Sequence, residues 1–239
     1  MCAATWPCPR DTKLGWRRNH DLNVQISKST PNEVCLFGAS IIGGLERYPH
    51  IWRKFFCGTL RAVNFGIGGD RSQHALWRAI NGEIPSSARC VVVNIGNNNL
   101  DRDPPTKIAN ATIAIGRKFQ EALPEVKVLL VGLLPRDEGY SFRRDRQQEV
   151  NTCLRNYCQR EESRVFFYLP PDNQFAPGAN GFLNKRLYYN DLLHLSRRGN
   201  ELFGRLIYNK ILNMLYRYGG RALGTIPQWT PMLSVSPKA

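Results

Sequence analysis

One serine stands where its hydroxyl could act as a nucleophile. Ser40 ends the tripeptide Gly38-Ala39-Ser40, which follows a short apolar run and precedes a segment with helical periodicity. A serine at a strand-to-helix turn exposes its hydroxyl beside the positive end of the helix dipole, which favours an anion forming next to it. An ordinary helix N-cap serine occupies the same kind of position, so Ser40 alone does not indicate catalysis.

Two polar loops could supply hydrogen-bond donors to such an anion. Residues 64–70 read NFGIGGD, and their glycines let backbone N–H groups approach a ligand closely. This loop fits the G-x-G-x-x-G dinucleotide fingerprint poorly. Residues 96–99 read GNNN, and their side-chain amides could donate into the same cleft. Taken singly, each segment is also typical of an ordinary loop or flexible turn.

An acid and a base stand close together near the C-terminus. Asp191 and His194 are separated by two leucines, and residues three apart on one helical turn or tight loop face the same way. The carboxylate can therefore accept a hydrogen bond from one imidazole nitrogen, which would set the tautomer and stabilise the imidazolium once His194 takes a proton. A simple surface pair would have the same spacing, so this segment too leaves two interpretations open.

The elements that must position these residues alternate along the chain. Continuous apolar runs predict strands buried on both faces at residues 34–37, 61–65, 90–95, 126–133 and 164–169. Helical periodicity lies at residues 41–56, 72–80, 106–123, 145–160 and 197–218. The alternation predicts βαβ units, and hence a three-layer α/β/α sandwich whose parallel sheet has five strands in the flavodoxin-like order 2-1-3-4-5. Ligands bind at the carboxyl edge of such a sheet, which the serine and both loops follow.

Together the four segments resemble a known set of motifs. GAS, NFGIGGD, GNNN and D-x-x-H are similar to the four blocks of the SGNH, or GDSL, hydrolase superfamily. The resemblance becomes closer to the catalytic subunits of intracellular platelet-activating factor acetylhydrolase through residues 48–52, 63–70, 76–78, 81–83, 132–136 and 191–195. Trp16 and His20 also match residues of that family. The likeness spans roughly residues 16–217.

The resemblance implies a carboxylic ester hydrolase that works through an acyl-enzyme. Ser40 would be the nucleophile, His194 the general base and then the general acid, and Asp191 the residue that orients it. The oxyanion hole would consist of the backbone N–H groups of Ser40 and Gly69 and the side-chain amide of Asn98. The substrate implied is a short acyl ester, such as an acetyl ester or a phospholipid like platelet-activating factor.

The sequence departs from the family pattern at two positions. Ala39 stands where the family usually has an aspartate before the nucleophile, and Asn97 stands where close relatives have a threonine. A lost helix-cap carboxylate costs about 1 kcal/mol, but neither change removes a group that must react. A catalytically weak or inactive protein that keeps the fold for binding or assembly therefore stays open as an alternative.

Composition sets the broader limits. The 239 residues predict one α/β domain over residues 16–218, with an N-terminal extension (1–15) and a C-terminal tail (219–239) rich in proline and glycine. We expect both ends to be loose or to lie along the surface. The seven scattered cysteines and the absence of an apolar leader favour reduced thiols in the cytoplasm. The four histidines show no metal-ligand spacing, so no metal or cofactor is expected, and three of them, His20, His50 and His74, are interpreted as structural or surface residues.

Partners are implied by the family and by the charge. The resemblance implies a homodimer or heterodimer, and a β-propeller partner in the acetylhydrolase case. The formal net charge of +14 would suit nucleic acid or anionic membranes, as in the SGNH esterase domains of some non-LTR retrotransposons. The basic residues form only short doublets and no nucleic-acid-binding motif is present, so a soluble enzyme with a basic surface is the simpler interpretation.

Overall fold

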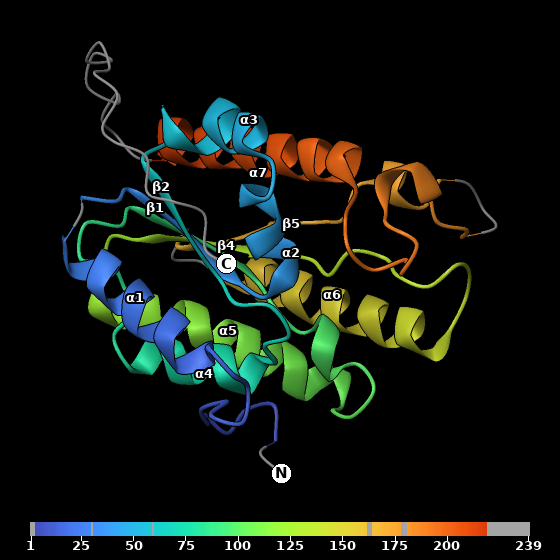
Figure 1. The fold of residues 1–239 in the computed structure, drawn as a ribbon, viewed down its shortest axis with the longest axis horizontal. Coiled ribbons are helices and arrows are strands. Elements are labelled where there is room, and N and C mark those ends of the chain that lie inside the picture. The colour runs from blue at the N-terminus through green and yellow to red at the C-terminus, as the bar shows by residue number, and fades with distance from the viewer. Residues whose placement is uncertain (1–2, 30, 59, 162–163, 178–180, 219–239) are drawn as a thin grey trace.

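The computed structural model describes residues 3–29, 31–58, 60–161, 164–177 and 181–218. Its centre is a five-stranded parallel sheet in the order β2-β1-β3-β4-β5, with helices on both faces (Figure 1). The strands are β1 (Val34–Gly38), β2 (Ala62–Gly66), β3 (Cys90–Asn94), β4 (Lys127–Val131) and β5 (Phe166–Leu169). The predicted class and strand order are confirmed, and the strand positions agree to within two residues.

The strands are apolar throughout because both faces of the sheet are covered. Val34 and Leu36 of β1 belong to one buried cluster, whereas Cys35 and Phe37 belong to the other. Alternate side chains of a strand point to opposite faces, so neither face can be polar when helices cover both. Helices α1 (Trp16–Ser29), α4 (Ser72–Ile80), α5 (Pro105–Ala122) and α6 (Phe142–Arg160) lie on one side, and α7 (Arg197–Tyr218) lies with α3 (Pro49–Trp52) on the other (Figure 1).

The helix predicted over residues 41–56 was wrong as a single element. The structure has α2 (Ser40–Gly43), a 3-10 turn (Gly44–Glu46), α3 and a π-helical turn (Arg53–Cys57). The break comes at Tyr48, whose backbone is extended because the ring of Pro49 disfavours a helical conformation in the residue before it. Proline is tolerated at the first position of a helix, where no N–H is needed, so α3 begins at Pro49.

Helix α1 was not predicted. Its buried residues are Trp16, His20, Asn23 and Ser27, which follow helical spacing but are mostly polar. Apolar periodicity cannot detect a helix whose buried face carries hydrogen-bonding groups. The buried polar residues of α1 are explained only by the residues on other elements with which they form hydrogen bonds.

The ends of the chain differ in what the structure describes. At the N-terminus, Ala4 is fully buried, and its N–H donates to Asp103 Oδ1 over 3.1 Å while its carbonyl accepts from Ser72 Oγ over 3.1 Å. This segment therefore lies against the loop between β3 and α5 and against the start of α4. The predicted C-terminal tail, residues 219–239, lies outside the described residues.

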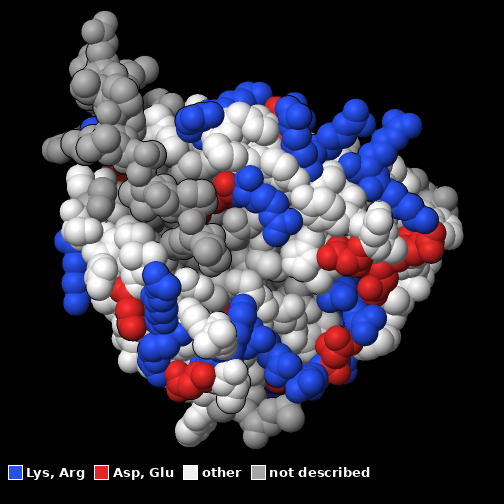
Figure 2. All heavy atoms as spheres, in the orientation of Figure 1, with Lys and Arg blue, Asp and Glu red and all other residues white. Residues whose placement is uncertain are grey.

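Charged side chains of both signs are visible on one face of the molecule (Figure 2). On the face seen in Figure 2, lysine and arginine side chains lie all round the molecule, with acidic side chains among them. The net charge of +14 therefore does not gather into one basic stripe on that face. Within the described residues, no helix is both long enough and apolar enough to cross a membrane.

Candidate active site

Ser40, His194 and Asp191 form a chain of hydrogen bonds at the carboxyl edge of the sheet. His194 Nε2 lies 2.9 Å from Ser40 Oγ, and His194 Nδ1 lies 2.6 Å from Asp191 Oδ2. A carboxylate only accepts, so Nδ1 carries the ring proton and Nε2 is the acceptor that faces the serine hydroxyl. The serine and the histidine, 154 residues apart in the chain, are thus placed in the geometry of a nucleophile and its base.

The acid and the base belong to a tight loop rather than to a helix. Asp191 Oδ1 accepts from the backbone N–H groups of Leu193 and His194 over 3.0 and 2.9 Å. Leu192 has a φ of +52°, and an isolated bridge joins Tyr188 to Leu195 across the loop. The carboxylate therefore holds the backbone of the loop with one oxygen and the imidazole with the other.

The electrostatics of this loop keep Asp191 ionised. Partial burial raises the pKa of Asp191, but the hydrogen bonds from the His194 ring and from the two backbone N–H groups outweigh it, so the pKa lies below its usual value. The side chains of His194 and Asp191 are 36% and 49% exposed, so water and a substrate can reach them.

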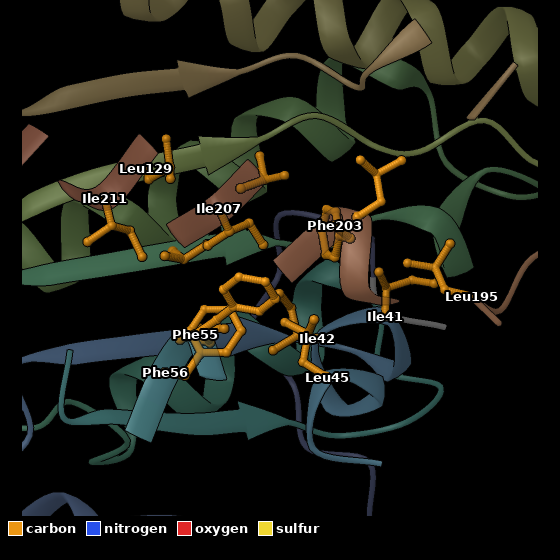
Figure 3. Close-up of a cluster of buried hydrophobic side chains, with 14 of the residues drawn as sticks. Ile41, Ile42, Leu45, Phe55, Phe56, Leu129, Leu195, Phe203, Ile207 and Ile211 are labelled. Carbon is orange, nitrogen blue, oxygen red and sulfur yellow. The ribbon is translucent and has the colours of Figure 1, made fainter. Parts of the chain in front are cut away.

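The reactive pair is anchored by its immediate neighbours in the chain. Ile41 follows Ser40 and Leu195 follows His194, and both are buried in the cluster on the α7 side of the sheet. Figure 3 shows Ile41 and Leu195 close together at one end of that cluster, beside Phe203. Packing of these apolar side chains therefore sets the distance between the serine and the histidine.

Close approach of α2 to β2 requires glycine. A Cβ on Gly66 would lie 2.3 Å from the backbone nitrogen of Gly43, and no side chain tolerates such a contact. The side chain of Asn64 reaches the same place and donates to the carbonyl of Ile42 over 2.8 Å. The glycine and the asparagine of the NFGIGGD loop thus fasten the serine-bearing helix to the neighbouring strand.

Of the predicted oxyanion donors, Asn98 lines the same hollow as Ser40, and Gly69 does not. Asn98 Nδ2 donates one N–H to the carbonyl of Asp70 over 2.8 Å, which leaves its second N–H for another acceptor. Asn98, Ser40 and Leu193 line a hollow of about 10 Å³, roughly the room of one water molecule. Gly69, with a φ of +78°, is not among the residues that line this hollow and lies on the next loop.

A larger, shallow hollow lies beside the imidazole. Its volume is about 480 Å³. It is lined by Arg47, Tyr189, Asn190, Asp191 and His194. The guanidinium of Arg47 lies 5.6 Å from the centre of the Tyr189 ring, a cation–π contact between two of the lining residues. The site therefore has a narrow side next to Asn98 and a wide side next to His194.

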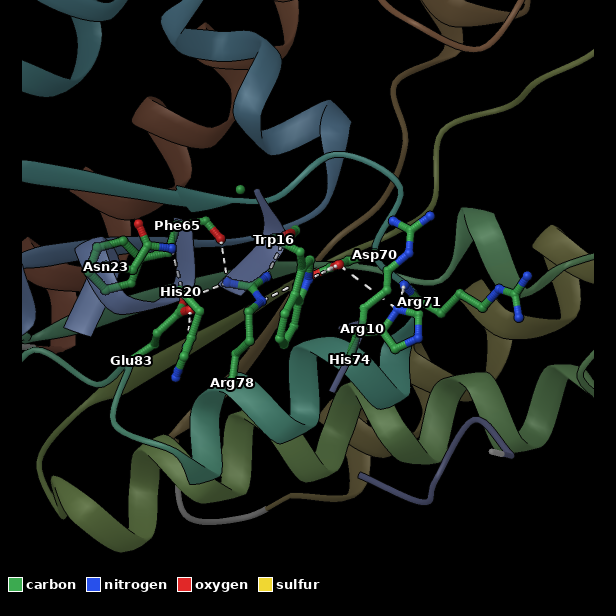
Figure 4. A network of polar contacts seen from close by, with 12 residues as sticks. Arg10, Trp16, His20, Asn23, Phe65, Asp70, Arg71, His74, Arg78 and Glu83 are labelled. Atoms are coloured by element: carbon green, nitrogen blue, oxygen red, sulfur yellow. Dashed lines mark hydrogen bonds and ion pairs between the residues drawn. The ribbon is translucent and has the colours of Figure 1, made fainter. Parts of the chain in front are cut away.

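Beneath the loop after β2 lies a fully buried polar network, seen in Figure 4. Arg78, Asp70 and Glu83 are each 0% exposed. Arg78 donates to Asp70 Oδ2 over 2.8 Å and to Glu83, and also to the carbonyls of Phe65 and Gly38, each over 2.9 Å. One guanidinium thus joins the ends of β1 and β2, the strands that precede Ser40 and the glycine-rich loop.

Helix α1 completes this network. Trp16 Nε1 donates to Asp70 Oδ1 over 2.7 Å, and His20 Nδ1 lies 2.8 Å from Glu83 Oε1. Asn23 donates to Glu83 Oε2 over 3.0 Å. Sequence reasoning placed Trp16 and His20 only by family resemblance, and the interpretation of His20 as structural agrees with its buried position. No local pattern could have revealed these residues, because their partners are far away in the chain.

The two departures from the family pattern leave the site intact. Ala39, at the start of α2, makes no side-chain cap, but its carbonyl still accepts from Gly43 N–H over 2.9 Å. Asn97 Oδ1 is buried and has no hydrogen-bond partner within the described residues.

Within the described residues there is no group of three or more His, Cys, Asp or Glu side chains able to hold a metal ion.

A serine, an imidazole and a carboxylate in series at the carboxyl edge of a 2-1-3-4-5 parallel sheet form the nucleophile, base and orienting acid of an acyl-transfer hydrolase. Residues 36–202 match the GDSL-like Lipase/Acylhydrolase family, and the chain belongs to it. Platelet-activating factor acetylhydrolase IB subunit alpha1 of Bos taurus is 32% identical over 217 residues, 90% of each chain. The Homo sapiens protein of the same name is 32% identical over 223 residues, 93% of this chain and 90% of its own.

Solved structures agree on the fold. The crystal structure of a GDSL-like lipase from Bacteroides thetaiotaomicron has a TM-score of 0.66 and 20% sequence identity. It covers 82% of this chain and 97% of its own. The family match and the relatives confirm the SGNH hydrolase resemblance and the assignment to carboxylic ester hydrolases, and the solved structure agrees with the predicted fold.

Proposed function

We propose that this protein is a serine esterase that hydrolyses short acyl esters through an acyl-enzyme on Ser40. The observation that carries the proposal is the hydrogen-bond chain from Ser40 Oγ through the His194 ring to Asp191, with links of 2.9 and 2.6 Å. A serine hydroxyl becomes a useful nucleophile only when a base can take its proton during attack, and this chain supplies that base.

The reaction would proceed in two halves. Ser40 Oγ attacks the ester carbonyl while His194 Nε2 takes its proton, and the carbonyl oxygen becomes an oxyanion. Donors from Ser40 N–H, Gly69 N–H and the free N–H of Asn98 stabilise that charge. The carbon–oxygen bond to the alcohol then breaks as His194 protonates the departing oxygen. Water, deprotonated by His194, attacks the acyl-enzyme, and the carboxylic acid leaves as the proton returns to Ser40.

The shape of the site supports a short acyl group on a larger alcohol. The hollow between Ser40 and Asn98 holds about 10 Å³, whereas the hollow beside His194 holds about 480 Å³. If the acyl group enters the narrow side, the smallest acyl groups such as acetyl are favoured and a long chain is excluded. The wide side, lined in part by Arg47, would then take the alcohol. A phospholipid such as platelet-activating factor, named in the relatives, is such an ester.

We also propose a cytoplasmic setting and a dimeric state. The cysteines Cys8, Cys35, Cys57, Cys90, Cys153 and Cys158 are free in the structure, which supports a reducing compartment. The relatives are named as subunits, which supports assembly with a second chain.

The experiment compares the wild type with Ser40→Ala on p-nitrophenyl esters of increasing acyl length. The wild type should show a serine-dependent burst with the acetyl ester and lose rate sharply by the hexanoyl ester. Ser40→Ala should lose about 10⁵-fold in kcat, and Ser86→Ala, an exposed serine away from the site, should lose nothing. If Ser40→Ala kept the wild-type rate, the assignment of Ser40 as the nucleophile would be refuted.

Labelling by a fluorophosphonate separates the esterase from an inactive relative. The wild type should be labelled at Ser40. A folded wild type that neither turns over nor labels would show a binding or assembly protein instead. Tight RNA binding that falls steeply with added salt would then favour the nucleic-acid role suggested by the net charge of +14.

A further inference from the structure

The N-terminal strap, residues 3–15, packs against the glycine-rich loop that follows β2. Its backbone joins the start of α4, where Cys8 N–H donates to the carbonyl of Gln73 over 3.3 Å. From there the strap carries Arg10 and Lys13 to the loop itself. Figure 4 shows Arg10 beside Asp70 and His74, above the first turn of α4. A segment that reads from sequence as an extension thus reaches the edge of the candidate active site.

Both cations of the strap donate to the same carbonyl oxygen. Arg10 Nη1 lies 3.2 Å from the carbonyl oxygen of Gly68, and Lys13 Nζ also donates to it. A Cβ on Gly69 would lie 2.5 Å from Arg10 Nη1, so the guanidinium also packs directly on Gly69. Charged donors make hydrogen bonds about twice as strong as neutral ones, and here two of them converge on one acceptor.

That carbonyl belongs to the peptide bond whose other end is the Gly69 N–H. The proposed function uses this N–H as an oxyanion donor, and within the described residues the structure gives it no protein acceptor. We propose that Arg10 and Lys13 are positioning residues of the oxyanion hole, which hold and polarise the Gly68–Gly69 peptide so that its N–H serves the developing oxyanion. The inference rests on the proposed esterase function.

Two physical effects follow from this arrangement. The peptide group is planar, so fixing the carbonyl oxygen also fixes the direction of the N–H on the opposite side. Gly69 has a φ of +78° and no side chain, so without the two cations its peptide would turn easily. Hydrogen bonds to the carbonyl also draw electron density from the nitrogen, which makes the N–H a stronger donor.

The position of Lys13 supports a local electrostatic role. A Cβ on Gly68 would lie 3.9 Å from Lys13 Nζ and 3.9 Å from Ser40 Cβ, so the ammonium lies no farther than twice that distance from Ser40 Cβ. Burial lowers the pKa of Lys13, Arg10 lowers it further, and Asp70 opposes them. Lys13 is partly buried, so its charge is screened by water less than that of a fully exposed lysine.

The test uses p-nitrophenyl acetate, a neutral ester that needs no cation for binding. Lys13→Met and Arg10→Met should each lower kcat about tenfold and leave KM within twofold, since a donor is weakened but not removed. The double variant should lose less than the product of the two, because both residues act on one carbonyl. Lys13→Arg should recover most of the rate. The matched control is Arg18→Met, which removes an exposed charge of α1.

A second measurement does not depend on turnover. The backbone ¹⁵N and ¹H shifts of Gly69 should move upfield in Lys13→Met and Arg10→Met and stay unchanged in Arg18→Met, because the Gly68 carbonyl loses its charged donors. Unchanged Gly69 shifts would overturn the inference. If the wild type is active through Ser40, the inference would also be overturned by variants that keep the wild-type kcat or that change only KM. An inactive wild type would instead refute the esterase proposal, with the Gly69 shifts still deciding whether the cations polarise the peptide.

Discussion

The two halves of the candidate active site are built in opposite ways. The triad half, Ser40, His194 and Asp191, is partly exposed, and His194 and Asp191 keep 36% and 49% of their side-chain surface open. The network half, centred on Arg78, Asp70 and Glu83, is wholly buried, and the guanidinium is engaged by carboxylates and carbonyls on all sides. Reactive groups need access and spare bonding capacity, whereas the groups that fix the backbone around them need neither.

This contrast teaches where each kind of damage should appear. Changes in the triad should alter the rate of reaction with little effect on folding, because their hydrogen bonds lie at the surface where water can replace them. Changes in the network should alter the stability of the fold, because a buried charge left without its partner cannot be solvated. Substitutions in each half test that separation.

Asp191→Asn should lower kcat about 10³-fold. The amide nitrogen facing Nδ1 of His194 would favour the tautomer with its proton on Nε2, which can no longer accept the proton of Ser40. The amide oxygen can still accept the backbone N–H groups of Leu193 and His194, so the midpoint of thermal unfolding should hardly change. Steady-state kinetics and a melting curve check both parts, with Asp21→Asn, an exposed acid on α1, as control.

Arg78→Met should lower the free energy of unfolding by about 3–5 kcal/mol, because it removes the cationic partner of two buried carboxylates, Asp70 and Glu83. Urea unfolding measures the loss. The matched control is Arg17→Met, whose side chain is 47% exposed and pairs with Asp11 over 2.6 Å, and it should cost less than about 1 kcal/mol. Equal losses in the two variants would contradict the contrast drawn above.

Asn98→Ala should lower kcat about 100- to 1,000-fold, the usual cost of one oxyanion donor. It also removes the hydrogen bond to the Asp70 carbonyl, so a loss of about 1 kcal/mol of stability should accompany it. Asn98→Asp should be slower still, because a carboxylate would face the developing oxyanion. If Asn98→Asp matched Asn98→Ala in rate, the side chain would not face the oxyanion.

His74 gives the smallest effect and a pH signature. Burial, with the nearby charges of Arg10, Arg71 and Arg78, lowers its pKa from 6.5 to about 4. The folded protein thus favours the neutral ring, whose Nδ1 accepts from Arg71 N–H over 3.1 Å. Between pH 6.5 and about pH 4, His74 binds more protons in the unfolded chain than in the folded protein. The contribution of His74 to stability is therefore complete above pH 6.5 and is lost as the pH falls toward 4.

The variant His74→Asn tests this dependence, because an amide oxygen can replace Nδ1 as the acceptor. Between pH 7 and 4.5 the wild type should lose on the order of 1–2 kcal/mol more stability than the variant, after allowance for solvent screening. Urea unfolding at three pH values measures the difference. Parallel pH dependences in the two proteins would show that His74 does not titrate as expected.

Prediction from sequence succeeded where the physical cause was local. The five strands were found because a strand covered on both faces must be apolar along its whole length, and α4 and α7 were found with their observed bounds. It failed over residues 41–56, where the conformation of Tyr48 before Pro49 breaks the helix despite a favourable apolar pattern. It also missed α1, whose buried face is polar.

The candidate site divides along the same line. Asp191 and His194 are three residues apart, so their own spacing was enough to predict that they face each other. Ser40 and His194 are 154 residues apart, and only the sheet order and the packing of Ile41 and Leu195 bring them within 2.9 Å. The placement of Arg10 and Lys13 on the Gly68 carbonyl could not be read from the sequence at all, because nothing near them in the chain records what they touch. Sequence alone thus determined the five strands, most of the long helices and the short-range pair, since those depend on neighbouring residues, whereas the meeting of distant polar groups was decided by tertiary packing.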